Sequence, residues 1–330
     1  MNDKQNALEI IKFGKPDRVM TYAPCYGVSY YGADHQGYEC TEHAYSHNRP
    51  VGGKWLDIWG TQWHKEYPDV MGFPKGTPLA DISNLAKYTW PDPNDERLCS
   101  LIYEQAEKFC NPDEQMLSGS HRDTLWEKSY MLVGMENMME YFYTEPEYAR
   151  EILHNIMNFQ LGIAMHYEKI GVEFVSLTDD MGTQSGLLLG KKIFDEFLYP
   201  EYKRIFDFYK SREILIMLHS CGHVEPLLES FIELGVNLLD PMQVTANNLE
   251  NVISITQGRM AIGGGISTDL LMSGSPEEIN LTVKNSINLL GSRGGYFCYP
   301  DQSMPFPMEN VTIFNEAVIK YGKYPLNTTP

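Results

Sequence analysis

Short apolar runs alternate with longer amphipathic stretches through the carboxy-terminal two thirds of the chain. Short apolar runs are typical of strands buried in a parallel sheet, and the longer stretches have the spacing of a helix with one apolar face. We expect strands at residues 130–135, 173–178, 213–219, 237–240, 260–264 and 295–299, and helices at 146–169, 191–211, 224–234, 246–256, 276–290 and 308–321.

Alternating strands and helices predict a parallel sheet, and seven or eight such units in one chain predict a closed (β/α)8 TIM barrel of the α/β class. Residues 19–24 are the expected first strand. Residues 25–122 break the rhythm with many aromatic, Gly and Pro residues, so we expect them to form loops and short helices capping the barrel mouth. No repeat or low-complexity linker divides the chain, which favours one domain over residues 1–330.

Charge and composition narrow the class of partner. The 330 residues include 26 basic and 44 acidic side chains, a net charge of −18, which argues against binding to nucleic acid or to an anionic membrane. We find neither a signal peptide nor an apolar stretch long enough to span a membrane, so we expect a cytoplasmic protein. Six scattered cysteines form no disulfide framework and are expected to be free or metal-bound.

A candidate metal site lies at the end of the apolar run 213–219. Residues i and i+2 of an extended chain point the same way, so His219 and Cys221 can converge on one ion. Cys298, in another short β-rich run at 294–300, is the third expected ligand. Three protein ligands with one open position are typical of catalytic zinc. The alternative is that the three side chains belong to the core.

Other polar residues follow predicted strand ends, where active sites of barrels lie. Asp179 and Asp180 are candidates for orienting a metal ligand or a substrate hydroxyl, with capping of a turn as the alternative. Gln243 is expected at the same face. Aromatic residues crowd the capping region and suit a flat apolar ligand, although they could equally pack the lid on the barrel. The candidate substrate-binding residues among them are Tyr22, Tyr26, Tyr30 and Trp59.

Five segments, taken together and in order, resemble the uroporphyrinogen decarboxylase superfamily. They are DDMGTQSG (179–186), HSCG (219–222), GVNLLDPMQ (235–243), GGGIS (263–267) and PMEN (307–310). The resemblance implies a barrel and either a decarboxylase or a zinc-dependent methyltransferase that exchanges methyl groups with a corrinoid protein. The His-x-Cys pattern with a later Cys is similar to the methyltransferase branch. The decarboxylases' amino-terminal arginine motif has no counterpart in the arginine-free segment 25–32.

Within that branch, the aromatic segments 55–63 and 88–93 resemble methyltransferases that demethylate methoxylated aromatic compounds. The implied reaction transfers a methyl group from such a donor to cobalt(I) of a corrinoid (cobalamin), with Zn²⁺ as the resident metal. No Asp-x-His-x-x-Gly corrinoid motif occurs in the chain, so the corrinoid is expected on a separate cognate protein. Methylation of a thiol by a methylated corrinoid is the alternative. The oligomeric state is left open, with a homodimer as one option.

Overall fold

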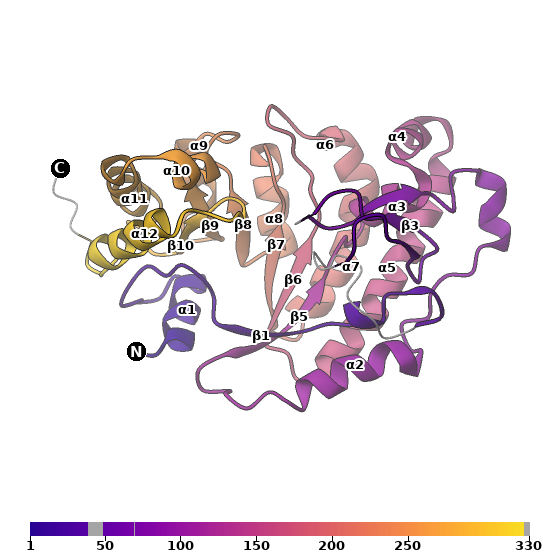
Figure 1. The fold of residues 1–330 in the computed structure, drawn as a ribbon, viewed down its shortest axis with the longest axis horizontal. Coiled ribbons are helices and arrows are strands. Elements are labelled where there is room, and N and C mark those ends of the chain that lie inside the picture. Colours follow the sequence, from indigo (N-terminus) through magenta and orange to yellow (C-terminus); the bar gives the residue numbers. More distant parts are fainter. Residues whose placement is uncertain (39–48, 69, 327–330) are drawn as a thin grey trace.

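Seven parallel strands form the main sheet in the computed structural model, which describes residues 1–38, 49–68 and 70–326. Their order in the sheet follows their order in the chain, and neighbouring strands are joined by helices as the alternating pattern predicts (Figure 1). The strands are β1 (Cys25–Val28), β5 (Met116–His121), β6 (Phe174–Thr178), β7 (Leu215–His219), β8 (Leu238–Met242), β9 (Ala261–Ile266) and β10 (Tyr296–Pro300).

The two edges of this sheet approach each other through the segment that precedes β1. Met20 forms an isolated parallel bridge with Phe297 of β10, and the Cys298 amide donates to the Met20 carbonyl at 2.8 Å. The expected first strand at 19–24 is therefore only this bridge, and the strand itself begins at Cys25. The α/β barrel architecture is confirmed, with seven strands in the sheet of the described residues.

The helices gather in two groups on the outside of the sheet (Figure 1). One group, beside β9 and β10, is α10 (Thr268–Ser273), α11 (Pro276–Leu290) and α12 (Met308–Tyr321). Beside β5 to β7 lie α3 (Trp126–Val133), α4 (Met135–Thr144), α5 (Pro146–Lys169), α6 (Gly190–Ile193), α7 (Tyr199–Lys210) and α8 (Leu228–Leu234). Helix α9 (Leu249–Thr256) contacts α8 and is drawn next to α10 in Figure 1. The amino-terminal helix is α1 (Asp3–Ile11), and α2 (Glu96–Ala106) precedes β5.

Strand residues alternate between the helices and the barrel interior. On β7, Ile216 and Leu218 are fully buried in the main apolar core against the helices, whereas Met217 lines a hollow of about 500 Å³ inside the sheet. Phe174 and Phe297 line the same hollow from β6 and β10. This alternation decides which residues of each strand can reach the site at the barrel mouth.

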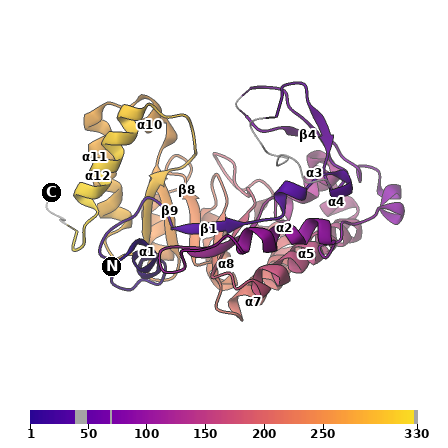
Figure 2. The ribbon, with the colours of Figure 1, turned by 60° about the horizontal axis from the view of Figure 1, so that its bottom comes forward.

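The expected capping region has more regular structure than its sequence predicts. It contains a three-stranded antiparallel sheet of β2 (Lys54–Leu56), β3 (Gln62–His64) and β4 (Phe73–Gly76), hereafter the lid sheet. Figure 2 shows β4 standing beside α3. The predicted region also includes the barrel strands β1 and β5, which were not expected there. Of its residues, 39–48 and 69 lie outside the described part of the chain.

One predicted strand is a helix. The run 130–135 was expected to be extended, but it lies largely in α3, which begins at Trp126. The Asp179 carboxylate, at the end of β6, accepts hydrogen bonds from the backbone amides of Leu125, Trp126 and Glu127. A carboxylate at this position satisfies amides that a helix start leaves unpaired and favours the helix through its dipole. No helix in the described residues is long and apolar enough to cross a membrane.

Candidate functional site

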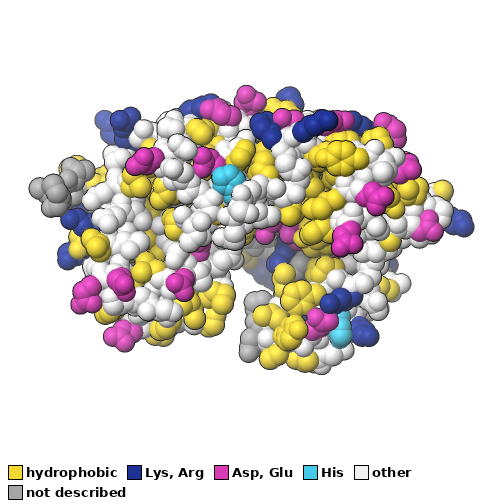
Figure 3. Space-filling view, turned by 90° about the horizontal axis from the view of Figure 1, so that it is seen from above, with side chains coloured by type: hydrophobic (Ala, Val, Ile, Leu, Met, Phe, Trp, Pro, Cys, Tyr) yellow, Lys and Arg dark blue, Asp and Glu magenta, His cyan; other side chains and the backbone are white. Residues whose placement is uncertain are grey.

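A cavity of about 740 Å³ opens at the carboxyl ends of β5 to β8. Its floor is built from residues that directly follow these strands, and the lid sheet supplies one wall through Trp63, Phe73 and Pro74. Figure 3 shows this face of the molecule hollowed between two lobes, with acidic and basic side chains inside the hollow. We refer to it as the mouth cavity.

Three potential metal ligands converge in the mouth cavity. Asp180, His219 and Cys221 each offer one donor atom, and the three donors lie within 4.8 Å of one another. The His219 Nε2 atom is 3.5 Å from Cys221 Sγ and 3.8 Å from Asp180 Oδ1. The predicted convergence of His219 and Cys221 is found in the structure, and Asp180 joins them from the end of the neighbouring strand β6.

The His219 ring is oriented from behind by a carboxylate. Its Nδ1 atom lies 2.9 Å from Asp240 Oδ1, and the Tyr299 hydroxyl donates to Asp240 Oδ2 at 3.1 Å. Burial disfavours the charged imidazole, but hydrogen bonds to Asp240 and Cys221 outweigh it and raise the pKa of His219 to about 11. Partners that stabilise a proton on Nε2 would also stabilise a metal cation there, and a carboxylate behind a histidine is typical of metal sites.

Two loops that carry the ligands approach each other closely at glycine residues. A Cβ atom on Gly182 would lie 2.6 Å from the His223 amide nitrogen, and Gly222 has φ +82°. Only glycine fits such an approach without displacing the backbone. The Cys221 amide donates to Asp180 Oδ1 at 2.8 Å and therefore ties the two loops together.

Gln243 and Gln302 complete the polar edge of the cavity. Gln243 lines it, as expected, and its Oε1 accepts a hydrogen bond from the Gly222 amide at 2.5 Å, so the side chain supports the loop that carries Cys221. Gln302, which follows β10, donates from Nε2 to Cys221 Sγ at 3.0 Å. Gln302 could not be predicted from the sequence, because it lies two residues beyond the strand in a segment without a metal-binding pattern.

Cys298 does not lie beside the other two expected ligands. It is fully buried between β10 and the helices, in an apolar cluster with Ile287 of α11 and Phe314 of α12. Its neighbours Phe297 and Tyr299 face inward instead. Burial raises the pKa of the Cys298 thiol to about 12, which opposes formation of a thiolate. The physical reason is the alternation of the strand, which turns this position outward.

Asp179 also has a different place from its neighbour Asp180. Its side chain is fully buried, accepts the three amides at the start of α3 and receives a hydrogen bond from the Tyr202 hydroxyl. These contacts favour the alternative considered for Asp179, a structural role in capping. Asp180 is the carboxylate of the pair that lines the mouth cavity.

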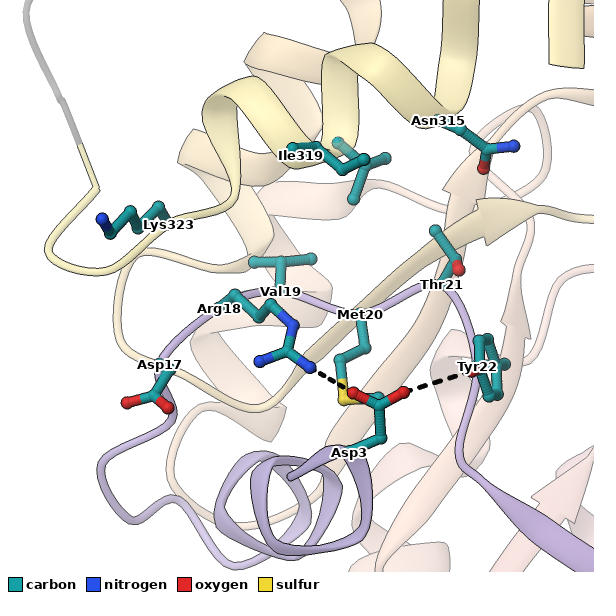
Figure 4. A pocket seen from close by; sticks show the side chains of 11 residues that line it. Asp3, Asp17, Arg18, Val19, Met20, Thr21, Tyr22, Asn315, Ile319 and Lys323 are labelled. Atoms are coloured by element: carbon teal, nitrogen blue, oxygen red, sulfur yellow. Dashed lines mark hydrogen bonds and ion pairs between the residues drawn. The ribbon is translucent and has the colours of Figure 1, made fainter. Parts of the chain in front are cut away.

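The four predicted aromatic residues do not line the mouth cavity. Tyr30 and Trp59 are each 1% exposed and pack on Phe159 of α5. Tyr26 packs on Phe109 in a tilted arrangement and donates to the Gln105 carbonyl. Tyr22 lines the hollow inside the barrel and also a separate hollow beside α12, where its hydroxyl contacts Asp3 Oδ2 at 3.3 Å (Figure 4). The structure therefore places none of the four on the mouth cavity, and the packing alternative describes Tyr26, Tyr30 and Trp59.

Residues other than these four candidates form the walls, among them two further aromatic residues of the capping region, Tyr31 and Trp63. The aromatic and methionine side chains of the mouth cavity are Tyr31, Trp63, Met71, Phe73, Tyr130 and Met131. Its charged side chains besides Asp180 are Arg122, Asp123 and Glu127. Burial, and after it the charges of neighbouring carboxylates, raises the pKa of Glu127 to about 9. Burial also raises the pKa of Asp123, to about 7, although the positive charge of Lys128 acts to lower it. Arg122 to Glu127 immediately follow β5, and the failure to predict that strand concealed them.

Comparisons with known proteins agree with this architecture. The family model described as uroporphyrinogen decarboxylase (URO-D) matches residues 69–321. A methylated-thiol–coenzyme M methyltransferase of Methanosarcina mazei is 24% identical over 193 residues, 56% of this chain and 48% of the relative. The methylcobamide:CoM methyltransferase MtbA of the same organism is 22% identical over 151 residues, 44% of this chain and 42% of the relative. The matched regions span about half the length of these relatives.

A solved structure described as a methyltransferase from Methanosarcina mazei covers 97% of this chain and 99% of its own, with a TM-score of 0.64 and 15% identity. At that identity the likeness concerns the fold. It extends over almost the whole of both chains.

Proposed function

The chain belongs to the uroporphyrinogen decarboxylase family, and from this premise we propose that it is a zinc-dependent methyltransferase. In the proposed reaction, a methoxylated aromatic compound donates its methyl group to the cobalt(I) of a corrinoid held by a separate protein. The observation that carries the proposal is the convergence of Asp180, His219 and Cys221 in a cavity with an aromatic wall.

The names of the relatives support methyl transfer as the class of reaction. Both names include coenzyme M (CoM), and one also includes a methylcobamide. A decarboxylase acting on a polycarboxylate needs several cations around its substrate, whereas Arg122 is the only Lys or Arg among the described residues that line the mouth cavity. This composition favours the methyltransferase reading within the family.

The donor atoms fit zinc. Zn²⁺ is commonly bound by imidazole nitrogen, thiolate sulfur and carboxylate oxygen, and catalytic sites keep a position open. His219, Cys221 and Asp180 offer one donor of each kind on the cavity side of the sheet. When bound, zinc supplies a Lewis acid that polarises an ether oxygen and stabilises negative charge as it leaves.

The chain's own residues position the reactants. Asp240 fixes the His219 ring, while Gln243 and the Cys221–Asp180 hydrogen bond hold the ligand loops. Trp63 and Phe73 of the lid sheet, with Tyr130 of α3, give an aromatic ring a wall to pack against and exclude water. In the overall reaction the O–CH₃ bond breaks, a cobalt–carbon bond forms, and the oxygen keeps the electron pair as a phenolate.

Methylation of a thiol is the second candidate function. The names of the relatives favour it, because coenzyme M is a thiol. In that direction Asp180, His219 and Cys221 would hold the metal, the thiol acceptor would bind at its open position as a thiolate, and a methylated corrinoid would be the donor.

A donor panel distinguishes the two. Purified protein with its metal is mixed with cobalt(I) cobalamin and methoxylated phenols, and methylcobalamin is measured by its absorbance; separately, loss of methylcobalamin is followed with small thiols. The proposal expects methylcobalamin to form from a methoxyarene. Reaction of methylcobalamin with a thiol, without transfer from any methoxyarene, would replace it with the thiol-methylating function.

A further inference from the structure

The alternation of β5 aims one cationic side chain into the mouth cavity. Ser118 lines the hollow inside the barrel and Ser120 the mouth cavity, whereas His121 points away and bonds to Gln160 and Tyr209. Arg122, two residues beyond Ser120, continues the inward series and lines the mouth cavity. Its direction is therefore set by the strand.

The guanidinium is held in place by its surroundings. Its Nη2 atom is 3.2 Å from the Met71 sulfur, and its Nε atom is 3.9 Å from Asp123 Oδ1. Asp123 is shared with the buried Lys128, whose Nζ is 3.9 Å from Oδ2. Asp123 has φ +50°, a left-handed conformation that is uncommon for a residue with a side chain and is concentrated at functional sites.

Arg122 shares this part of the cavity with acidic side chains. Asp123 faces two cations, Arg122 and Lys128. Burial, followed by the neighbouring carboxylates, raises the pKa of Glu127. Asp180 belongs to the group with His219 and Cys221. Among the described residues that line the mouth cavity, Arg122 is the one Lys or Arg, so a small anion there would meet its guanidinium.

The distance from Arg122 to the metal-ligand group suits one small molecule. Arg122 follows β5 and His219 ends β7, with β6 between them. Strands in a sheet are about 4.8 Å apart, so the ends of β5 and β7 are separated by about 10 Å. The side chains of Arg122 and His219 both line the cavity and shorten this backbone separation, so a substituted benzene ring or a short thiol bearing an acid group can reach from one to the other. Tyr31 and Tyr130 line the same cavity and offer apolar surface to such a molecule.

We propose that Arg122 forms an anion subsite of the mouth cavity, and that the small-molecule substrate carries an acid group bound there while its reacting atom lies at Asp180, His219 and Cys221. This inference rests on the proposed function and deepens it. The shared chemistry is a tethered anion, a carboxylate on an aromatic methyl donor or a sulfonate on a thiol acceptor. Arginine recognises both through paired, charge-assisted hydrogen bonds.

The test compares the binding of matched anionic and neutral probes by calorimetry. The first pair is 4-methoxybenzoate and 4-methoxybenzamide, and the second is 2-mercaptoethanesulfonate and 2-mercaptoethanol. Within a pair the reacting group is the same, so the ratio of affinities isolates the acid group. We expect one anion to bind about ten- to a hundredfold more tightly than its neutral partner, the range for hydrogen bonds to charged groups. The pair that responds identifies the source of the anion.

Variants at position 122 locate the effect. Arg122→Met should abolish the preference for the anion, and Arg122→Lys should keep part of it because the charge remains but the paired geometry is lost. Arg259→Met is the matched control, since Arg259 pairs with Glu229 on the exposed surface away from the cavity. The zinc content of all variants should match that of the parent protein. Equal binding of anionic and neutral probes in both pairs, or an anion preference that survives Arg122→Met, would overturn the proposal.

Failure of this inference can be told apart from failure of the proposed function. If neutral methoxyarenes transfer their methyl group to cobalt(I) as well as anionic ones, and Arg122→Met leaves this unchanged, the anion subsite is wrong and the methyltransferase proposal stands. If no methoxyarene transfers a methyl group but anion binding depends on Arg122, the subsite stands and the donor assignment is wrong.

Discussion

Single residues decide the ligand set of the candidate metal site. His219 and Cys221 were predictable because two residues apart on a strand share a direction whatever the rest of the fold does. The same alternation places Cys298 on the outer face of β10. The sequence alone does not say which positions of this strand face inward, whereas in the structure Phe297 and Tyr299 face inward. Asp180 takes the place expected of the second cysteine.

Substitution of the ligands tests this set. We expect about one zinc per chain, retained by Cys298→Ala and lost by Cys221→Ala, because only the second removes a donor from the mouth cavity. Metal content after dialysis, measured by emission spectroscopy with circular dichroism as a check of folding, gives the answer. Loss of zinc from a folded Cys298→Ala protein would restore the set expected from sequence.

Acid should release the metal. Zinc binding requires a neutral His219 ring and a Cys221 thiolate, so protons compete with the ion. Burial disfavours the charged His219 ring, but Asp240 and Cys221 outweigh it and raise its pKa to about 11 in the metal-free protein, so protons compete with the ion at neutral pH and more strongly as pH falls. With a chelator present, zinc occupancy should drop before pH reaches about 4, the range of ordinary carboxylates. Occupancy that persists below this range would point to ligands that are mostly carboxylates.

Asp179 shows how a residue in one element selects the conformation of another. The apolar run 130–135 is compatible with a strand or a helix, and its own residues do not distinguish the two. The carboxylate that binds the first amides of α3 comes from β6, more than fifty positions later, so local sequence could not reveal it. Element positions were predicted best where no such long-range contact intervenes, as in β7 and α11.

Replacement of Asp179 should destabilise the fold. Asp179→Asn replaces one of the two oxygens that accept from three amides and the Tyr202 hydroxyl by an NH₂ donor, and we expect the unfolding free energy to fall by about 1–3 kcal/mol, the cost of buried donors left without an acceptor. Chemical unfolding measures it. Asp207→Asn, at an exposed position on α7, is the control and should change stability little. Equal stability of the two variants would refute the capping role.

Lys128 joins the lid to the barrel. It is 1% exposed, and its ammonium lies over the ring of Trp59 at 5.3 Å. Burial opposes its charge, yet the carboxylates of Asp57, Asp123 and Asp34 outweigh burial and raise the pKa of Lys128. Asp57 and Asp34 belong to the segment that carries the lid sheet, and Asp123 belongs to the turn after β5. The positive charge of Lys128 therefore balances carboxylates of both the lid and the barrel.

Removal of that cation should loosen the lid. Lys128→Met leaves buried carboxylates without their partner, and breaking such a group costs about 3–5 kcal/mol. We expect a lower unfolding free energy and faster proteolysis within residues 49–90. Lys75→Met, on the exposed face of β4, is the matched control because its ion pair with Glu66 is at the surface. Unchanged proteolysis in Lys128→Met would show that packing alone holds the lid.

At the scale of the whole molecule, the sequence predicted the barrel and the face on which the site lies. The reason is that the order of strands and helices limits the topology, and the carboxyl ends of parallel strands then share one face. The composition of the mouth cavity was not predictable to the same degree. Aromatic residues of the lid pack either on helices, as Trp59 does, or into the cavity, as Trp63 does. This choice depends on how the lid sheet folds onto α3.

The most direct test of the central claim is a single-turnover reaction with an isotopically labelled methoxyl group. Protein containing zinc is mixed with excess cobalt(I) cobalamin and a methoxyarene labelled in the methyl group, in parallel with Cys221→Ala. We expect labelled methylcobalamin and one equivalent of the free phenol per transferred methyl group from the parent protein, and neither product from the folded variant. Equal yields from both proteins, or no label on cobalt with any methoxyarene while the site holds its metal, would contradict it.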